Sequence, residues 1–387
     1  MAEPGARART RITVPRVEFD LGALFVGMIG VFAHELLWRL LAPAYGVQST
    51  FSVKLLQGGG LRDVELQGHA ALKAGFWSRI HEVLQIPYLD RLLEFLGAGL
   101  PGVVVPVGEG RVAPFRYELP WWQVGTSLLA LLLLWSIVGG ALARMHAVRI
   151  ARDESLAWDD GFAFSFSNLR ALLAAPLFAL AAAALFAALT AAAGAVVAIP
   201  WAGPLLQIVL LPLAMLSGLV VTIILLGAVF GVPLIHAALA AERNGTLDAV
   251  SRTYSYAFTR PVLFVAGGTL VLAIGTIIGG LGAWFMERAT LTLVALGTMW
   301  SEGADQPLVI GYGAAANFGV PADLSELDAA RKISAWVAFA WSAVGILAVR
   351  GFVLSYVVGG LTDLYFLLRE EVDGTPRTEV HVDDGPE

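Results

Sequence analysis

The sequence contains no cysteine among its 387 residues. This absence excludes disulfide bonds, thiolate catalysis, iron–sulfur clusters and cysteine-based zinc sites. Charge is also scarce, because Asp, Glu, Lys and Arg make up 14% of the chain against roughly 25% of a typical soluble domain. A soluble core of this composition would lack the polar residues needed to cover its surface.

Apolar residues dominate the chain instead. They make up 57% of it, and the mean hydropathy is +0.73. Several apolar runs reach the roughly 20 residues that a helix needs to cross a bilayer. We therefore predict an all-α fold, a polytopic membrane helical bundle of about six transmembrane helices. Residues 1–20 are polar and Arg-rich, so we expect no cleaved signal peptide there.

Loops and spans alternate along the chain. The predicted order is a cytoplasmic N-terminal arm (1–20), a first span (21–43), an extracytoplasmic loop or cap (44–118), a four-helix unit with spans two to five (119–285), a second extracytoplasmic loop (286–332), a sixth span (333–368) and a disordered acidic cytoplasmic tail (369–387). Arg and Lys are denser in the segments assigned to the cytoplasm. By the positive-inside rule, both ends of the chain are predicted to be cytoplasmic.

An internal repeat links the second and fourth spans. His146-Ala147 is followed by a charged stretch and an aromatic pattern, and the same order recurs after His236-Ala237. Each half consists of a span running inward, a charged loop and a span running outward. The pattern therefore predicts a weak parallel repeat about an axis along the membrane normal.

The two charged loops of this repeat are predicted to be short amphipathic helices, which we call elbows. Helical spacing places large side chains on one face of each. The residues singled out are Trp158, Phe162 and Phe166 in the first elbow, and Glu242, Arg252, Tyr254 and Phe258 around the second. Two interpretations are open: a docking or lipid-sensing surface in the headgroup layer, or plain connectors between helices.

The stretch 233–261 resembles a loop of uncharacterised bacterial six-helix membrane proteins. Its pattern is a proline at the end of a span, a glutamate, a polar turn and an aromatic helix, here Pro233, Glu242, Gly245 and Tyr254. These proteins are related to the membrane domain of glycerophosphodiester phosphodiesterases, and the resemblance covers about 137–285. It implies a bacterial inner-membrane protein. The phosphodiesterase's catalytic barrel has no counterpart, so the resemblance implies no hydrolase activity.

Motifs that carry chemistry are missing from the sequence. His34-Glu35 begins like the zinc motif H-E-x-x-H, but position 38 is tryptophan, so the second ligand is lacking. The six histidines show no ligand spacing. We therefore expect no catalytic residue, no metal site and no cofactor.

Charges inside the spans are the remaining feature. Glu35 and Arg350 both lie about 15 residues, or roughly 22 Å, from the inner ends of their spans. A lone charge at that depth costs at least about 2.5 kcal/mol, so we predict a structural intramembrane pair between them. An ion-coupled gate is the functional alternative. The G-x-x-x-G pairs predicted to pack helices are Gly227 with Gly231 and Gly275 with Gly279.

Two functions fit these patterns. The first is a structural, assembly or partner-binding component of the membrane. The alternative is a transporter or permease for a small molecule or lipid, with a pathway at the repeat interface between spans two and three and spans four and five. Spans three to five hold few polar residues, which favours the first. The expected partners are the lipid bilayer and another membrane protein or further copies of the chain, with no nucleic acid.

Overall fold

The fold is taken from a computed structural model of the chain. The residues that it describes are 19–41, 121–197, 199, 203–242, 245–297, 299, 305–316, 321, 324 and 327–380. The predicted N-terminal arm up to residue 18, the whole predicted 44–118 cap and the last seven residues lie outside this described part.

Every element in the described part of the chain is an α-helix, in agreement with the predicted all-α class. The helices are α1 (Leu21–Leu41), α6 (Trp121–Arg152), α7 (Trp158–Ser167), α8 (Leu169–Val197), α9 (Gly203–Glu242), α10 (Thr246–Thr259), α11 (Pro261–Gly297), α12 (Asp305–Ala316) and α13 (Ala329–Asp373).

Four of these helices are long and apolar enough to cross a membrane, and the protein is membrane-embedded. The qualifying stretches are Leu129–Arg152, Leu169–Val196, Pro261–Leu296 and Ala329–Asp373. Helices α1 and α9 contribute shorter apolar stretches, among them Leu21–Leu37 and Ile208–Ile224. The number of six spans remains a prediction.

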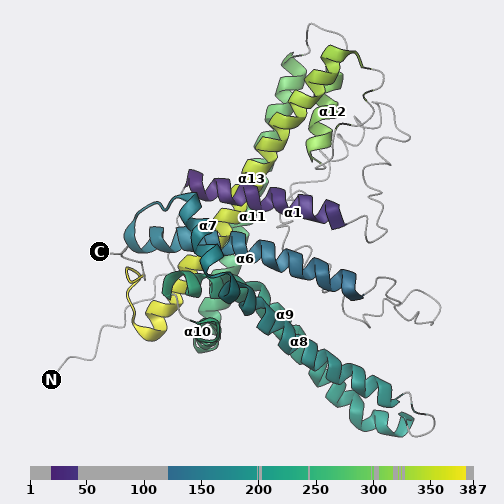
Figure 1. Cartoon of the computed structure of the whole chain (residues 1–387), viewed down its shortest axis with the longest axis vertical. Coiled ribbons are helices and arrows are strands. Elements are labelled where there is room, and N and C mark those ends of the chain that lie inside the picture. Colours follow the sequence, from purple (N-terminus) through teal and green to yellow (C-terminus); the bar gives the residue numbers. More distant parts are fainter. Residues whose placement is uncertain are drawn as a thin grey trace, which may run out of the picture.

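All six long helices have one terminus at the same end of the bundle. We call it the elbow end, because the short helices α7 and α10 lie there. Helices α6, α9 and α13 arrive at this end and contact one another, while α1, α8 and α11 leave from it. Figure 1 shows that the helices diverge from the elbow end: α8 and α9 form one arm, and α11 to α13 form another.

The buried core lies near the elbow end. Fully buried side chains there include Leu142 of α6, Leu234 of α9 and Phe366 of α13. Further along the arms the large apolar side chains are exposed, such as Ile208 on α9 and Trp341 on α13. In water this surface would be unfavourable, whereas lipid tails cover it at no cost, because they are as apolar as the side chains.

The start of α1 and both ends of α13 follow ordinary capping chemistry. The Asp20 carboxylate accepts hydrogen bonds from the backbone N–H groups of Gly22 and Ala23 at the start of α1. Asp328 caps α13 in the same way, accepting from the Arg331 N–H at 2.8 Å. Gly374, in the left-handed conformation at φ 72°, ends α13. These contacts fix where the first and last described helices begin and end.

The predicted extracytoplasmic loop at 286–332 contains helix over much of its length. Helix α11 continues to Gly297, and α12 and the start of α13 also fall within this range. Glu287 and Arg288 directly follow the predicted end of the fifth span. A charge ends an apolar run but does not terminate a helix, and Arg288 instead lies over the Trp284 ring one turn away, at 5.8 Å.

The predicted disordered tail at 369–387 is wrong where the structure describes it. Helix α13 runs on to Asp373, five residues beyond the predicted span. The segment 374–380 then folds back on the bundle, where Val380 packs against the core. The hydrogen bonds that hold this segment are described below.

The described chain contains the same order of long and short helices twice, while the internal repeat itself remains a prediction. A long helix, a short helix and a long helix follow one another twice, as α6–α7–α8 and as α9–α10–α11. Superposition of the two halves remains a prediction.

Helices α1 and α13 cross with almost no space between their backbones. A Cβ atom added to Gly27 would lie 2.3 Å from the carbonyl oxygen of Gly351. Real Cβ atoms do not approach other atoms so closely, so only glycine fits at this crossing.

Candidate functional site

The carboxylate of Glu242 lies at the centre of an ionic network at the elbow end. It ends α9 and is only 12% exposed. One oxygen accepts a hydrogen bond from Arg252 of α10 at 2.8 Å. The other accepts from the Tyr365 hydroxyl at 2.8 Å and lies 3.5 Å from the Arg369 guanidinium, both on α13. A single carboxylate therefore ties three helices together.

Arg369 connects this network to the C-terminal segment. Its side chain is 3% exposed, and the guanidinium carbon lies 4.8 Å from the centre of the Phe366 ring. Its Nη2 donates to the backbone carbonyls of Pro376 at 2.9 Å and Glu379 at 2.7 Å. These two bonds explain why the segment after Gly374 folds back instead of forming a tail.

Further contacts hold the same segment. Arg377 lies 2.9 Å from Glu370 and 3.0 Å from Asp363, so it bridges two carboxylates of α13. The Tyr256 hydroxyl of α10 donates a hydrogen bond to Asp373, the last residue of α13. The C-terminal part of the described chain is thus fastened to both α10 and α13.

Electrostatics keep the groups of α10 in their hydrogen-bond-donating forms. Burial, and then the hydrogen bond to Asp373, raise the pKa of Tyr256 well above its ordinary value. The neighbouring Glu242 carboxylate raises the pKa of Arg252. Tyrosine and arginine are already protonated near neutral pH, and both pKa shifts favour that form further. The arrangement suits a structural fastening.

The predicted elbow residues lie on α7 and α10, except Glu242, which ends α9. The α7 aromatics form a row, with ring centres 6.4 Å apart for Trp158–Phe162 and again for Phe162–Phe166. On α10, Tyr254 stacks on Phe258, which is 77% exposed. The opposite face of α10, with Tyr256, is buried against the bundle. Both short helices therefore present aromatic surface outward.

The structure brings Glu35 and Arg350 together. The Arg350 Nη1 lies 3.5 Å from the Glu35 Oε1, and both side chains are partly buried. Next to Glu35, His34 accepts a hydrogen bond from the Trp135 indole at 3.3 Å. This part of α1 is thus joined to α13 and to α6.

The predicted glycine motifs differ in their surroundings. Gly275 packs against α13, since an added Cβ would lie 3.0 Å from the Val357 side chain, and Gly279 is buried. An added Cβ at Gly227 or Gly231 would meet no described neighbour within 4 Å. The first pair therefore supports helix packing within the chain, whereas the second has no such partner in the described part.

The alternative function places a transport pathway between α6–α8 and α9–α11. The part of this interface that α6, α8 and α9 form is tightly packed. A Cβ at Gly139 would lie 3.0 Å from the His236 ring, and one at Gly140 would lie 2.6 Å from Leu172. Arg144 donates to the Ala240 carbonyl oxygen at 2.6 Å. The polar groups of this interface are therefore used in contacts between the helices.

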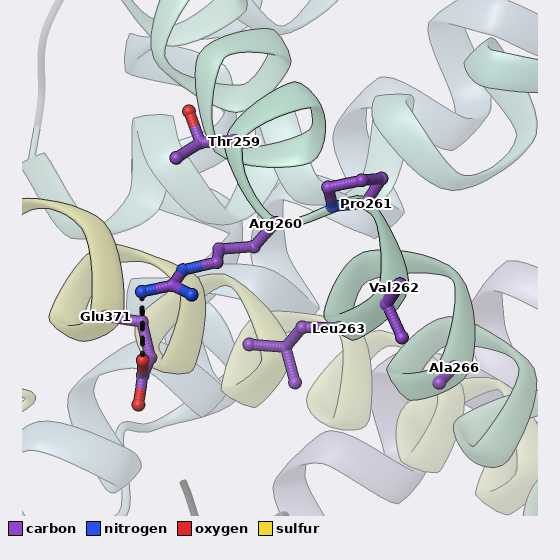
Figure 2. Close-up of a pocket in the computed structure, with 7 residues that line it drawn as sticks. All are labelled: Thr259, Arg260, Pro261, Val262, Leu263, Ala266 and Glu371. Carbon is purple, nitrogen blue, oxygen red and sulfur yellow. Dashed lines mark ion pairs between the residues drawn. The ribbon is translucent and has the colours of Figure 1, made fainter. Parts of the chain in front are cut away.

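A pocket of about 380 Å³ opens beside the network, where α10 meets α11. Figure 2 shows the residues that line it: Thr259, Arg260, Pro261, Val262, Leu263, Ala266 and Glu371. Arg260 and Glu371 face each other at 3.8 Å. Sequence reasoning missed this pocket, because Glu371 was assigned to the tail.

Sequence reasoning also missed Tyr256, Tyr365, Arg369 and Asp373. Within the described ranges, no three His, Asp or Glu side chains gather closely enough to hold a metal ion. Comparisons of the chain with protein-family models, with curated proteins and with solved structures returned no match.

Proposed function

We propose that this chain is a multi-pass protein of the bacterial inner membrane that serves as a structural or assembly component through contacts with a partner membrane protein. Six helices span the bilayer, and both ends of the chain are cytoplasmic. The similarity to uncharacterised bacterial six-helix membrane proteins belongs to this proposal.

Helix lengths support six spans. Helix α1 has 21 residues and α9 has 40, which correspond to about 31 Å and 60 Å, so both reach across the roughly 30 Å of bilayer hydrocarbon. The orientation is supported by arginines at the elbow end, among them Arg149, Arg170 and Arg260. Basic residues favour the cytoplasmic side.

The divergence of the two arms is the observation that carries the proposal (Figure 1). Large apolar side chains stay exposed on both arms, including Met215 of α9 at 68% and Phe285 of α11 at 64%. The charged groups around Glu242, by contrast, are engaged with one another. The arms therefore offer a wide intramembrane surface that an apolar helix of a partner could occupy.

The packing of the α6, α8 and α9 interface favours this function over transport. A pathway for a small molecule needs polar groups that line an opening near the midplane. Here the His236 and Leu172 side chains occupy the space beside Gly139 and Gly140. Arg144 donates a hydrogen bond to the Ala240 carbonyl oxygen.

Photocrosslinking in native membranes tests the proposed function. A benzophenone amino acid replaces Met215 or Phe285 on the arms, and Leu172, which is fully buried, serves as the matched control. We expect an adduct of defined mass from the two arm positions and none from the control. An adduct of twice the chain mass would identify a second copy as the partner. Adducts with lipid alone at both arm positions would contradict the proposal.

A further inference from the structure

The pocket at the start of α11 combines two opposite charges with an apolar wall. Arg260 and Glu371 lie on one side, and Val262, Leu263 and Ala266 line the other (Figure 2). Its volume of about 380 Å³ is at the lower end of the range for small-molecule sites, about 300–1,000 Å³. This space suits a polar headgroup better than a whole lipid.

The two charged side chains of this pocket, Arg260 and Glu371, do not form a short hydrogen bond with each other. Arg260 Nη2 lies 3.8 Å from the Glu371 carboxylate, whereas Arg252 and Arg149 approach their carboxylates to 2.8 and 2.9 Å. A charge-assisted hydrogen bond is typically about 2.7–2.9 Å long. Because a guanidinium carries five N–H donors, Arg260 has donors to offer a second partner. Glu371 likewise has acceptor capacity to offer a cation.

The surroundings of the pocket match the boundary between lipid headgroups and tails. Val262 of its lining is 80% exposed, and Phe258, which precedes Thr259 in the sequence, is 77% exposed. Pro261 begins the apolar stretch of α11 that is long enough to cross a membrane. This placement rests on the proposed function, in which the elbow end lies at the cytoplasmic membrane surface.

We propose that this pocket binds one phospholipid with a zwitterionic phosphoethanolamine headgroup. The phosphate would accept hydrogen bonds from Arg260, and the ammonium would donate to Glu371. The acyl chains would run along Val262, Leu263 and Ala266 towards the bilayer interior. An anionic phosphoglycerol headgroup satisfies Arg260 equally well but places no cation at Glu371, so the pair of charges selects the zwitterion.

Native mass spectrometry of the full chain, titrated with phosphatidylethanolamine or phosphatidylglycerol, tests this assignment. We expect the first lipid to bind about tenfold more tightly, equivalent to about 1.4 kcal/mol. Arg260→Gln should weaken both lipids about tenfold, because a charge-assisted contact to phosphate is lost. Glu371→Gln should reverse the preference, since the ammonium loses its anionic partner and the net negative phosphatidylglycerol headgroup loses a repulsive neighbour.

Matched variants separate a specific site from general attraction of lipids. Arg170→Gln removes an exposed arginine at the start of α8 and should leave both affinities unchanged within about twofold. Ala266→Trp fills the pocket and should lower phosphatidylethanolamine binding without removing a charge. Equal binding of the two lipids by the wild type, or equal losses in Arg170→Gln and Arg260→Gln, would overturn the proposal.

Soluble glycerophosphoethanolamine provides the last arm of the experiment. At the same concentration as phosphatidylethanolamine it should not displace the bound lipid, because it lacks the acyl chains that would lie on the apolar wall. Competition at equal concentration would show a site for a soluble metabolite and would overturn the lipid assignment. None of these results changes the membrane orientation, which is measured independently, so failure here is distinguishable from failure of the proposed function.

Discussion

Replacing Glu242 with alanine is expected to lower the free energy of unfolding by about 3–5 kcal/mol. The variant leaves Arg369, with a side chain only 3% exposed, without its carboxylate. It also removes the acceptor of the Tyr365 hydroxyl and the partner of Arg252. The loss is large because a buried charge without its partner keeps its full desolvation cost.

Unfolding in mixed micelles measures this loss. Glu370→Ala is the control: its carboxylate also binds an arginine but is 49% exposed, so we expect a change within about 1 kcal/mol. The double variant Glu242→Met with Arg369→Met should recover much of the stability, since it removes both buried charges. Similar losses in Glu242→Ala and Glu370→Ala would mean that Glu242 is not the centre of the network.

Gly27→Ala is expected to destabilise the protein by about 3 kcal/mol, at the upper end of the range for overpacking. The added Cβ would lie 2.3 Å from the Gly351 carbonyl oxygen and 2.9 Å from its carbonyl carbon. Both are backbone atoms, so no side chain can rotate away and the two helices must separate. The separation would also move Glu35 away from Arg350.

Gly218→Ala is the matched control for this prediction. Gly218 lies within α9, and an added Cβ there would meet nothing in the described chain within 4 Å. Alanine is a better helix former than glycine by about 0.8–1.0 kcal/mol, so this variant should be neutral or slightly stabilising. Thermal unfolding of the two variants in the same detergent compares them. A Gly27→Ala protein as stable as Gly218→Ala would show that α1 and α13 do not cross as described.

Sequence alone located the apolar helices but not their ends. Hydropathy indicates which side chains lipid can cover. Where a helix ends depends instead on capping residues and on helix-breaking residues such as glycine. Helix α11 passes Glu287 and Arg288 without interruption, and α13 passes Arg369 before Gly374 ends it. Charges were therefore poor markers of where these helices stop.

The Glu35–Arg350 contact could be predicted because the two residues lie at the same distance from the inner ends of their predicted spans. Two costly charges at the same depth on different spans have few other partners, so their distance from the span ends is informative. The network around Glu242 offered no such signal. Tyr365 and Arg369 lie on another helix, more than 100 positions away, and helical periodicity does not tell which faces meet. Glu242 and Arg252 were identified only as residues of a surface elbow.

All six long helices meet at one end of the bundle, and we propose that this end lies on the cytoplasmic side. Because the chain has no cysteine, single cysteines can be introduced without background and labelled with a membrane-impermeant maleimide. The positions are Asp160 on α7, Asp248 on α10 and Thr378 after α13, with Met299 at the opposite end of α11. We expect Met299→Cys to react in intact spheroplasts and the other three to react only after lysis. Labelling of Asp248→Cys from the same side as Met299→Cys would contradict the account.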